Sequence, residues 1–163
     1  MADLTPLDEK LGEVLGLAQA AQAATKKVSA MEDADDFERD LERMHEQAAE
    51  TERRTDELID GLDRKKTAIR DKASDTKSEA AEMMRTYLGG EDEALDGFEF
   101  LSMAEAGELC QWEIVEWMSD AIGAADVHDL ATWAVEVQRE HVEAVRSASL
   151  TLALQEITES ADG

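Results

Sequence analysis

Acidic and imidazole side chains three residues apart are the feature of this chain best suited to chemistry. The run 42–45, ERMH, places a carboxylate and an imidazole on one face of a helix. In helical bundles, two such pairs and a glutamate from each of two further helices hold hard cations such as iron or manganese. By this pattern the candidate metal ligands are Glu42, His45, Glu108, Glu113 and His141.

Two of the expected helices lack a residue that this pattern needs. Three residues before His141 stands Gln138 instead of a glutamate, and residues 14–31 contain no acid. We therefore expect at most a partial site. Its ligands also have structural interpretations, because a histidine on an apolar stripe, such as His141, is often a hydrogen-bonded core residue. Glu42 and His45 flank the stripe of their helix, as residues of a solvated face do.

Motifs for other chemistry are absent. The sequence has no glycine-rich phosphate loop, no Gly-x-Ser-x-Gly turn, and no cysteine–histidine pairing with an orienting acid. Its single cysteine, Cys110, cannot form an internal disulfide, and we expect it to be a small buried apolar residue. We assign no catalytic residue and favour a protein that is not an enzyme.

The charge of the chain restricts its partners. Forty acidic residues against sixteen basic ones give a net charge of −24, which disfavours nucleic acid and anionic membranes. Because the acids are spread along the whole chain, they favour a halophilic protein, kept in solution in a salt-rich cytoplasm, over one with an acidic binding tail. The longest uncharged run, 14–25, is too short to cross a membrane, and we expect a cytoplasmic protein.

The elements that must position these residues are helices. Apolar residues recur every three or four positions, no stretch alternates with period two, and the 163 residues contain one proline. We expect a single all-α domain, 1–163, built as an antiparallel four-helix bundle. The expected helices cover about 6–31, 36–64, 95–122 and 126–158. A long crossover, 65–94, would carry a short helix at 79–88 before Gly89 and Gly90.

Two patterns predict how the helices pack. The segment 98–122 is apolar on most of its circumference, so we expect it to be buried between neighbours, with its tryptophans as core anchors. A smooth ridge at a spacing of four predicts the close approach of another helix, with a ligand groove as the alternative. This ridge comprises Gly12, Gly16, Ala20 and Ala24.

The regular stripe of the second helix leaves another architecture open. Its apolar positions follow alternating steps of four and three from Phe37 to Leu62, which is typical of an antiparallel bundle or a coiled coil. A weaker stripe continues through Ile69 to Tyr87. The alternative is therefore one continuous helix over 37–88 in an extended coiled-coil hairpin.

Several short motifs resemble a known family. The runs 50–52 (ETE) with 57–59 (ELI), 78–83 (SEAAEM) and 112–114 (WEI) are similar to helix patterns of the ferritin-like stress proteins of the YciF type. This resemblance implies a ferritin-like four-helix bundle, commonly dimeric, with a dinuclear metal site and a role in stress. The chain departs from the family where metal ligands are expected, with Cys110-Gln111 in place of Glu-His and Ala18-Gln19 in place of an acid.

Two functions follow from these patterns. The first is a ferritin-like stress or metal-handling protein that binds iron or manganese at a partial carboxylate and histidine site. The second is a non-enzymatic helical-bundle or coiled-coil interaction protein that has lost the metal site. In both cases we expect a homo-oligomer, most simply a dimer, and a protein partner is compatible with the second.

Overall fold

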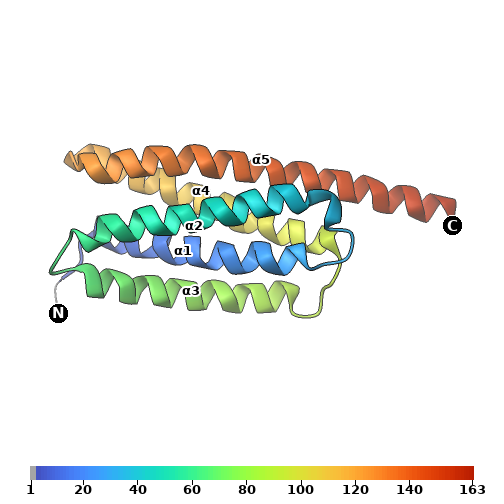
Figure 1. Cartoon of the computed structure of the whole chain (residues 1–163), viewed down its shortest axis with the longest axis horizontal. Helices are drawn as coiled ribbons and strands as arrows, with labels where there is room; N and C mark the ends of the chain where they lie inside the picture. The colour runs from blue at the N-terminus through green and yellow to red at the C-terminus, as the bar shows by residue number, and fades with distance from the viewer. Residues whose placement is uncertain (1–2) are drawn as a thin grey trace.

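The computed structural model describes residues 3–163, which form an all-helical protein with the helices side by side (Figure 1). This confirms the prediction of an all-α protein. The described residues contain five α-helices and a short 3-10 turn at Asp35–Phe37. The helices are α1 (Pro6–Ser29), α2 (Glu38–Asp60), α3 (Lys66–Leu88), α4 (Ala94–Ile122) and α5 (Ala125–Asp162).

The start of α1 is fixed by local hydrogen bonds. Thr5 and Asp8 form a capping box, in which the Asp8 amide donates to Thr5 Oγ1 at 3.2 Å and the Thr5 amide donates to Asp8 Oδ2 at 2.8 Å. Lys65 Nζ donates to the same carboxylate at 2.7 Å. Burial by itself raises the pKa of Asp8, but the hydrogen bonds from Lys65 and Thr5 outweigh it and lower that pKa. The turn before α3 is thus tied to the first turn of α1.

The segment between α2 and α4 differs from the prediction. Instead of a crossover with a short helix at 79–88, it forms the full-length helix α3, which lies along α1. The sequence 64–78 reads as polar nearly all round because α3 buries only a narrow edge, with Ile69 and Ala73 against α1. The alternative of one helix over 37–88 is also wrong, since the chain turns at 61–65.

The predicted smooth ridge brings α1 and α3 together. A Cβ added to Gly12 would lie 2.8 Å from the Ile69 carbonyl oxygen, and one added to Gly16 would lie 2.8 Å from Thr76 Cβ. Real Cβ contacts are longer, so only glycine allows this helix separation. The prediction of tight helix packing is confirmed for this half of the ridge.

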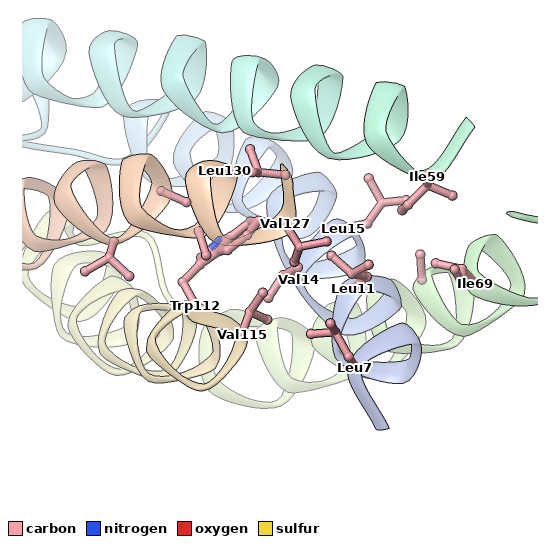
Figure 2. Close-up of a cluster of buried hydrophobic side chains, with 14 residues drawn as sticks. Leu7, Leu11, Val14, Leu15, Ile59, Ile69, Trp112, Val115, Val127 and Leu130 are labelled. Carbon is pink, nitrogen blue, oxygen red and sulfur yellow. The ribbon is translucent and has the colours of Figure 1, made fainter. Parts of the chain in front are cut away.

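The core consists of two apolar clusters, one toward each end of the bundle. In the first, Trp112 of α4 is fully buried beside Val127 of α5 and Val14 of α1 (Figure 2). In the second, the rings of Phe37 and Phe98 meet edge-on at a centroid distance of 5.1 Å. Each cluster joins helices that are far apart in the sequence.

The burial predicted for α4 holds on one side of the helix only. Phe98 and Trp112 are buried, but Cys110 is exposed and the side chain of Trp117 is 78 % exposed. The predictions that Cys110 is buried and that Trp117 is a core residue are therefore wrong. Both residues lie on the side of α4 that its helical neighbours leave uncovered.

Helices α4 and α5 form an antiparallel hairpin of unequal arms. Gly123 ends α4 in the left-handed conformation, with φ of 70°, which glycine adopts without strain. Because α5 has 38 residues and α4 has 29, α5 continues beyond the bundle (Figure 1). Leu152 is buried, whereas residues 153–163 are all exposed.

Candidate functional site

A buried polar cluster lies between α2, α4 and α5, in the region between the two apolar clusters. Helix α4 contributes Glu105 and Glu108, and α5 contributes Gln138 and His141; these four side chains are buried. The spacing of three on each helix places both of its side chains on one face. Gln47 of α2, which is partly buried, completes the cluster.

The hydrogen bonds of the cluster center on Glu105 and His141. Gln138 Nε2 donates to Glu105 Oε2 at 2.8 Å, and His141 Nδ1 lies 3.5 Å from the same oxygen. The other ring nitrogen, His141 Nε2, lies 2.6 Å from Gln47 Oε1. An amide oxygen only accepts, so Nε2 carries a proton. With the Nε2 proton directed at Gln47, the contact between His141 Nδ1 and Glu105 is attractive only if Nδ1 or the Glu105 carboxyl group also carries a proton.

Glu108 is the most electrostatically perturbed acid of the cluster. Burial is the largest cause and the negative charge of Glu105 the second; together they raise the pKa of Glu108 well above its ordinary value, with Gln138 offsetting part of the shift. A carboxyl group in this environment keeps its proton up to a higher pH than an exposed one does.

The five predicted metal ligands are not brought together. Glu108 and His141 belong to the cluster, but the Glu42 side chain is exposed. His45 Nδ1 lies 3.0 Å from the Gln22 carbonyl oxygen, and Glu113 lies 3.8 Å from Arg139 at the surface. The exposure of Glu42 agrees with the solvated-face interpretation, whereas His45 is partly buried against α1 and does not lie on a solvated face.

The cluster differs from a bundle metal centre in composition as well. In the part of the chain that the structure describes, no group of three or more His, Cys, Asp or Glu side chains is placed to hold a metal ion. Amides occupy two positions, since Gln138 and Gln47 contact the acid and the imidazole directly. His141 has the environment of a hydrogen-bonded core histidine, which was its structural interpretation.

An apolar groove opens beside the polar cluster. It has a volume of about 330 Å³ and runs between the second halves of α1 and α3 and the first half of α4. Ala20 and Ala24 line it, so this half of the smooth ridge forms the groove that was the alternative prediction. Three side chains of the groove are about half exposed, namely Met83, Tyr87 and Met103. Glu105 and Glu108 also border it.

The projecting end of α5 has a second unpartnered apolar surface. The stripe Leu150, Leu154 and Ile157 is 57 %, 66 % and 66 % exposed, and its spacing of four and three places it on one face of the helix. We call residues 150–162 the α5 tail. The spacing of this stripe can be read from the sequence, but the stripe is exposed because α5 extends past the ends of the other helices.

Comparisons with known proteins do not extend this description. No protein-family model, no curated protein and no solved structure matches the chain. Within residues 3–163, none of the helices combines the length and the apolar character needed to cross a membrane. The functional conclusion therefore depends on the chain's own surfaces and buried groups.

Proposed function

We propose that this protein is a non-enzymatic helical bundle that acts by self-association, through apolar surfaces at one end of the molecule. The observation that carries the proposal is the presence of two unpartnered apolar surfaces, the groove and the α5 tail, on a chain of net charge −24. Contiguous exposed apolar patches mark interaction sites in proteins. They are most informative here because the rest of the surface is so strongly charged.

A ferritin-like four-helix bundle with a stress or metal-handling role is the second candidate. The observation that favours it is the buried trio Glu105, Glu108 and His141 at the middle of the bundle, where such proteins hold iron or manganese. Two features weigh against it. Metal ligands must be deprotonated, whereas the environment of Glu108 raises its pKa, and Gln138 already donates a hydrogen bond to Glu105.

The acidic surface fits a halophilic protein. At −24 per chain, two copies repel each other strongly in dilute buffer, and molar salt shortens that repulsion to about 3 Å. Salt also strengthens apolar association when the anion is strongly hydrated. We therefore expect the chain to self-associate in molar salt and to dissociate in dilute buffer.

The test is light scattering after size-exclusion chromatography in molar salt, combined with elemental analysis for iron, manganese and zinc. The protein is purified without chelators or affinity tags, and His141→Ala is prepared in parallel. We expect an oligomer in both proteins and no stoichiometric metal in either. A monomer with nearly stoichiometric metal that disappears in His141→Ala would replace this proposal with the metal-handling candidate.

A further inference from the structure

We propose that the groove between α1, α3 and α4 receives the α5 tail of a second copy, so that two chains exchange tails in a reciprocal dimer. The inference rests on the proposed self-association and names the two surfaces that make it. It assigns the groove and the α5 tail, two unpartnered apolar surfaces among the described residues, to one contact.

The stripe of the α5 tail faces away from its own bundle. Leu152 packs into the bundle's second apolar cluster. On a helix of 3.6 residues per turn, Leu150, Leu154 and Ile157 lie about 140–200° around from it. The helix continues without a break to Asp162, so the tail cannot fold back onto the groove of its own chain. Its partner must be another molecule.

The groove matches such a helix in length and in wall chemistry. Along α4 it extends from Phe100 to Gln111, about 16 Å of helix, whereas the stripe from Leu150 to Ile157 spans about 10 Å. Alanines form much of the α1 and α3 walls, and small side chains let a further helix approach closely. Anchors at a spacing of four and three are the form in which an amphipathic helix docks in an apolar groove.

The charges of the two surfaces are complementary. Residues 147–163 contain three acids, Glu156, Glu159 and Asp162, and no lysine or arginine. Helix α3 has five basic and four acidic residues, and among the helices of the described chain it alone has a net positive charge. Its Lys77 borders the groove. The two glutamates of the groove lining, Glu105 and Glu108, are buried, so the exposed charge at its rim is that of Lys77. The acidic tail thus meets a positive charge at the groove.

The placement of the two surfaces permits a closed dimer. Helix α5 leaves the bundle at the end where the chain passes from α1 to α2 and from α3 to α4, and α5 and α3 lie on opposite sides (Figure 1). The groove lies in the same half of the molecule. A two-fold axis at this end, perpendicular to the view, places each tail on the α3 side of the other copy. The result is an isologous interface with two equivalent junctions.

Four variants, studied by sedimentation equilibrium in molar salt, test this arrangement. Ala104→Glu puts a charge into the groove, and its control Ala106→Glu changes an exposed alanine of the same helix outside the groove. The double variant Leu154→Gln with Ile157→Gln removes the stripe, and its control is Thr158→Gln. We expect dimer Kd values about thirtyfold or more higher for the groove and stripe variants, as for interface anchors, and unchanged values for both controls.

Mixing the two defective proteins is the decisive step. The groove variant keeps an intact tail and the stripe variant keeps an intact groove. We therefore expect the mixture to form a heterodimer with one working junction, although neither protein dimerises alone. If the stripe variant is monomeric but the groove variant dimerises normally, the tails pair with each other. That result overturns the tail-in-groove contact and leaves self-association standing, whereas a monomeric parent protein overturns both.

Discussion

Gly16→Ala is the substitution that examines the α1–α3 interface most sharply. Alanine is favoured over glycine inside a helix by about 0.8–1.0 kcal/mol, so the change would stabilise an isolated α1. In the folded protein the new Cβ would meet the Ala73 carbonyl oxygen and lie 2.8 Å from Thr76 Cβ. A backbone oxygen cannot rotate away, so α3 must move outward, and overpacking of this kind costs about 1–3 kcal/mol. Taking the upper part of that range, we expect a net destabilisation of about 2 kcal/mol.

The matched control is Gly107→Ala, at an interior position of α4 where an added Cβ meets nothing within 4 Å. Because Gly107 lines the groove, both glycine variants are made in the Leu154→Gln, Ile157→Gln protein, in which the tail contact is removed. We expect it to stabilise the protein by about 1 kcal/mol through helix propensity alone. The two variants should then differ by about 3 kcal/mol in the free energy of unfolding, measured by urea denaturation in molar salt with circular dichroism. Equal stabilities would show that α3 does not pack against α1 at this separation, and the five-helix arrangement would be refuted.

Three further predictions concern the core, the buried acid and the surface. Trp112→Ala should destabilise the protein by about 3–5 kcal/mol because the side chain is fully buried, and an unchanged urea midpoint would contradict that burial. Trp112→Phe should cost much less, since it removes Nε1, a buried donor for which the described residues supply no partner. Because folding raises the pKa of Glu108, this carboxyl group loses its proton at a lower pH in the unfolded chain than in the folded protein. The contribution of Glu108 to stability should therefore be fully present below its ordinary pKa of 4.5 and be lost with rising pH, by about 1.4 kcal/mol per pH unit until the folded-state pKa is reached. Glu108→Gln should flatten that decline and be the more stable protein at neutral pH; parallel pH profiles would show that Glu108 does not titrate differently in the two states. Finally, the net charge of −24 predicts a higher melting temperature in molar salt than in dilute buffer, and equal values would remove the halophile argument.

Most of the helices could be predicted because their signals are local. The Thr5 cap, the proline at the first position of α1 and Gly123 after α4 each act within one turn of the chain. The start of α3 could not be placed in this way. A helix that buries only a narrow edge shows little periodicity, and its docking partner, the Gly12–Gly16 ridge, lies about sixty residues earlier.

Only part of the candidate site could be predicted, and the reason is related. Spacing shows that Glu42 and His45 share a helix face, but not which way that face points, and in the structure Glu42 is exposed. The paired spacing of Glu105 with Glu108 and of Gln138 with His141 was the available signal for the buried cluster. The groove gave no such signal, because it is formed by three helices whose arrangement depends on α3.

Self-association is the central claim, and sedimentation equilibrium of the unmodified chain in molar salt tests it most directly. We predict a mass near twice the 17.9 kDa of one chain, with dissociation on dilution and on lowering the salt concentration. A mass that stays at 17.9 kDa over the whole accessible concentration range would contradict it.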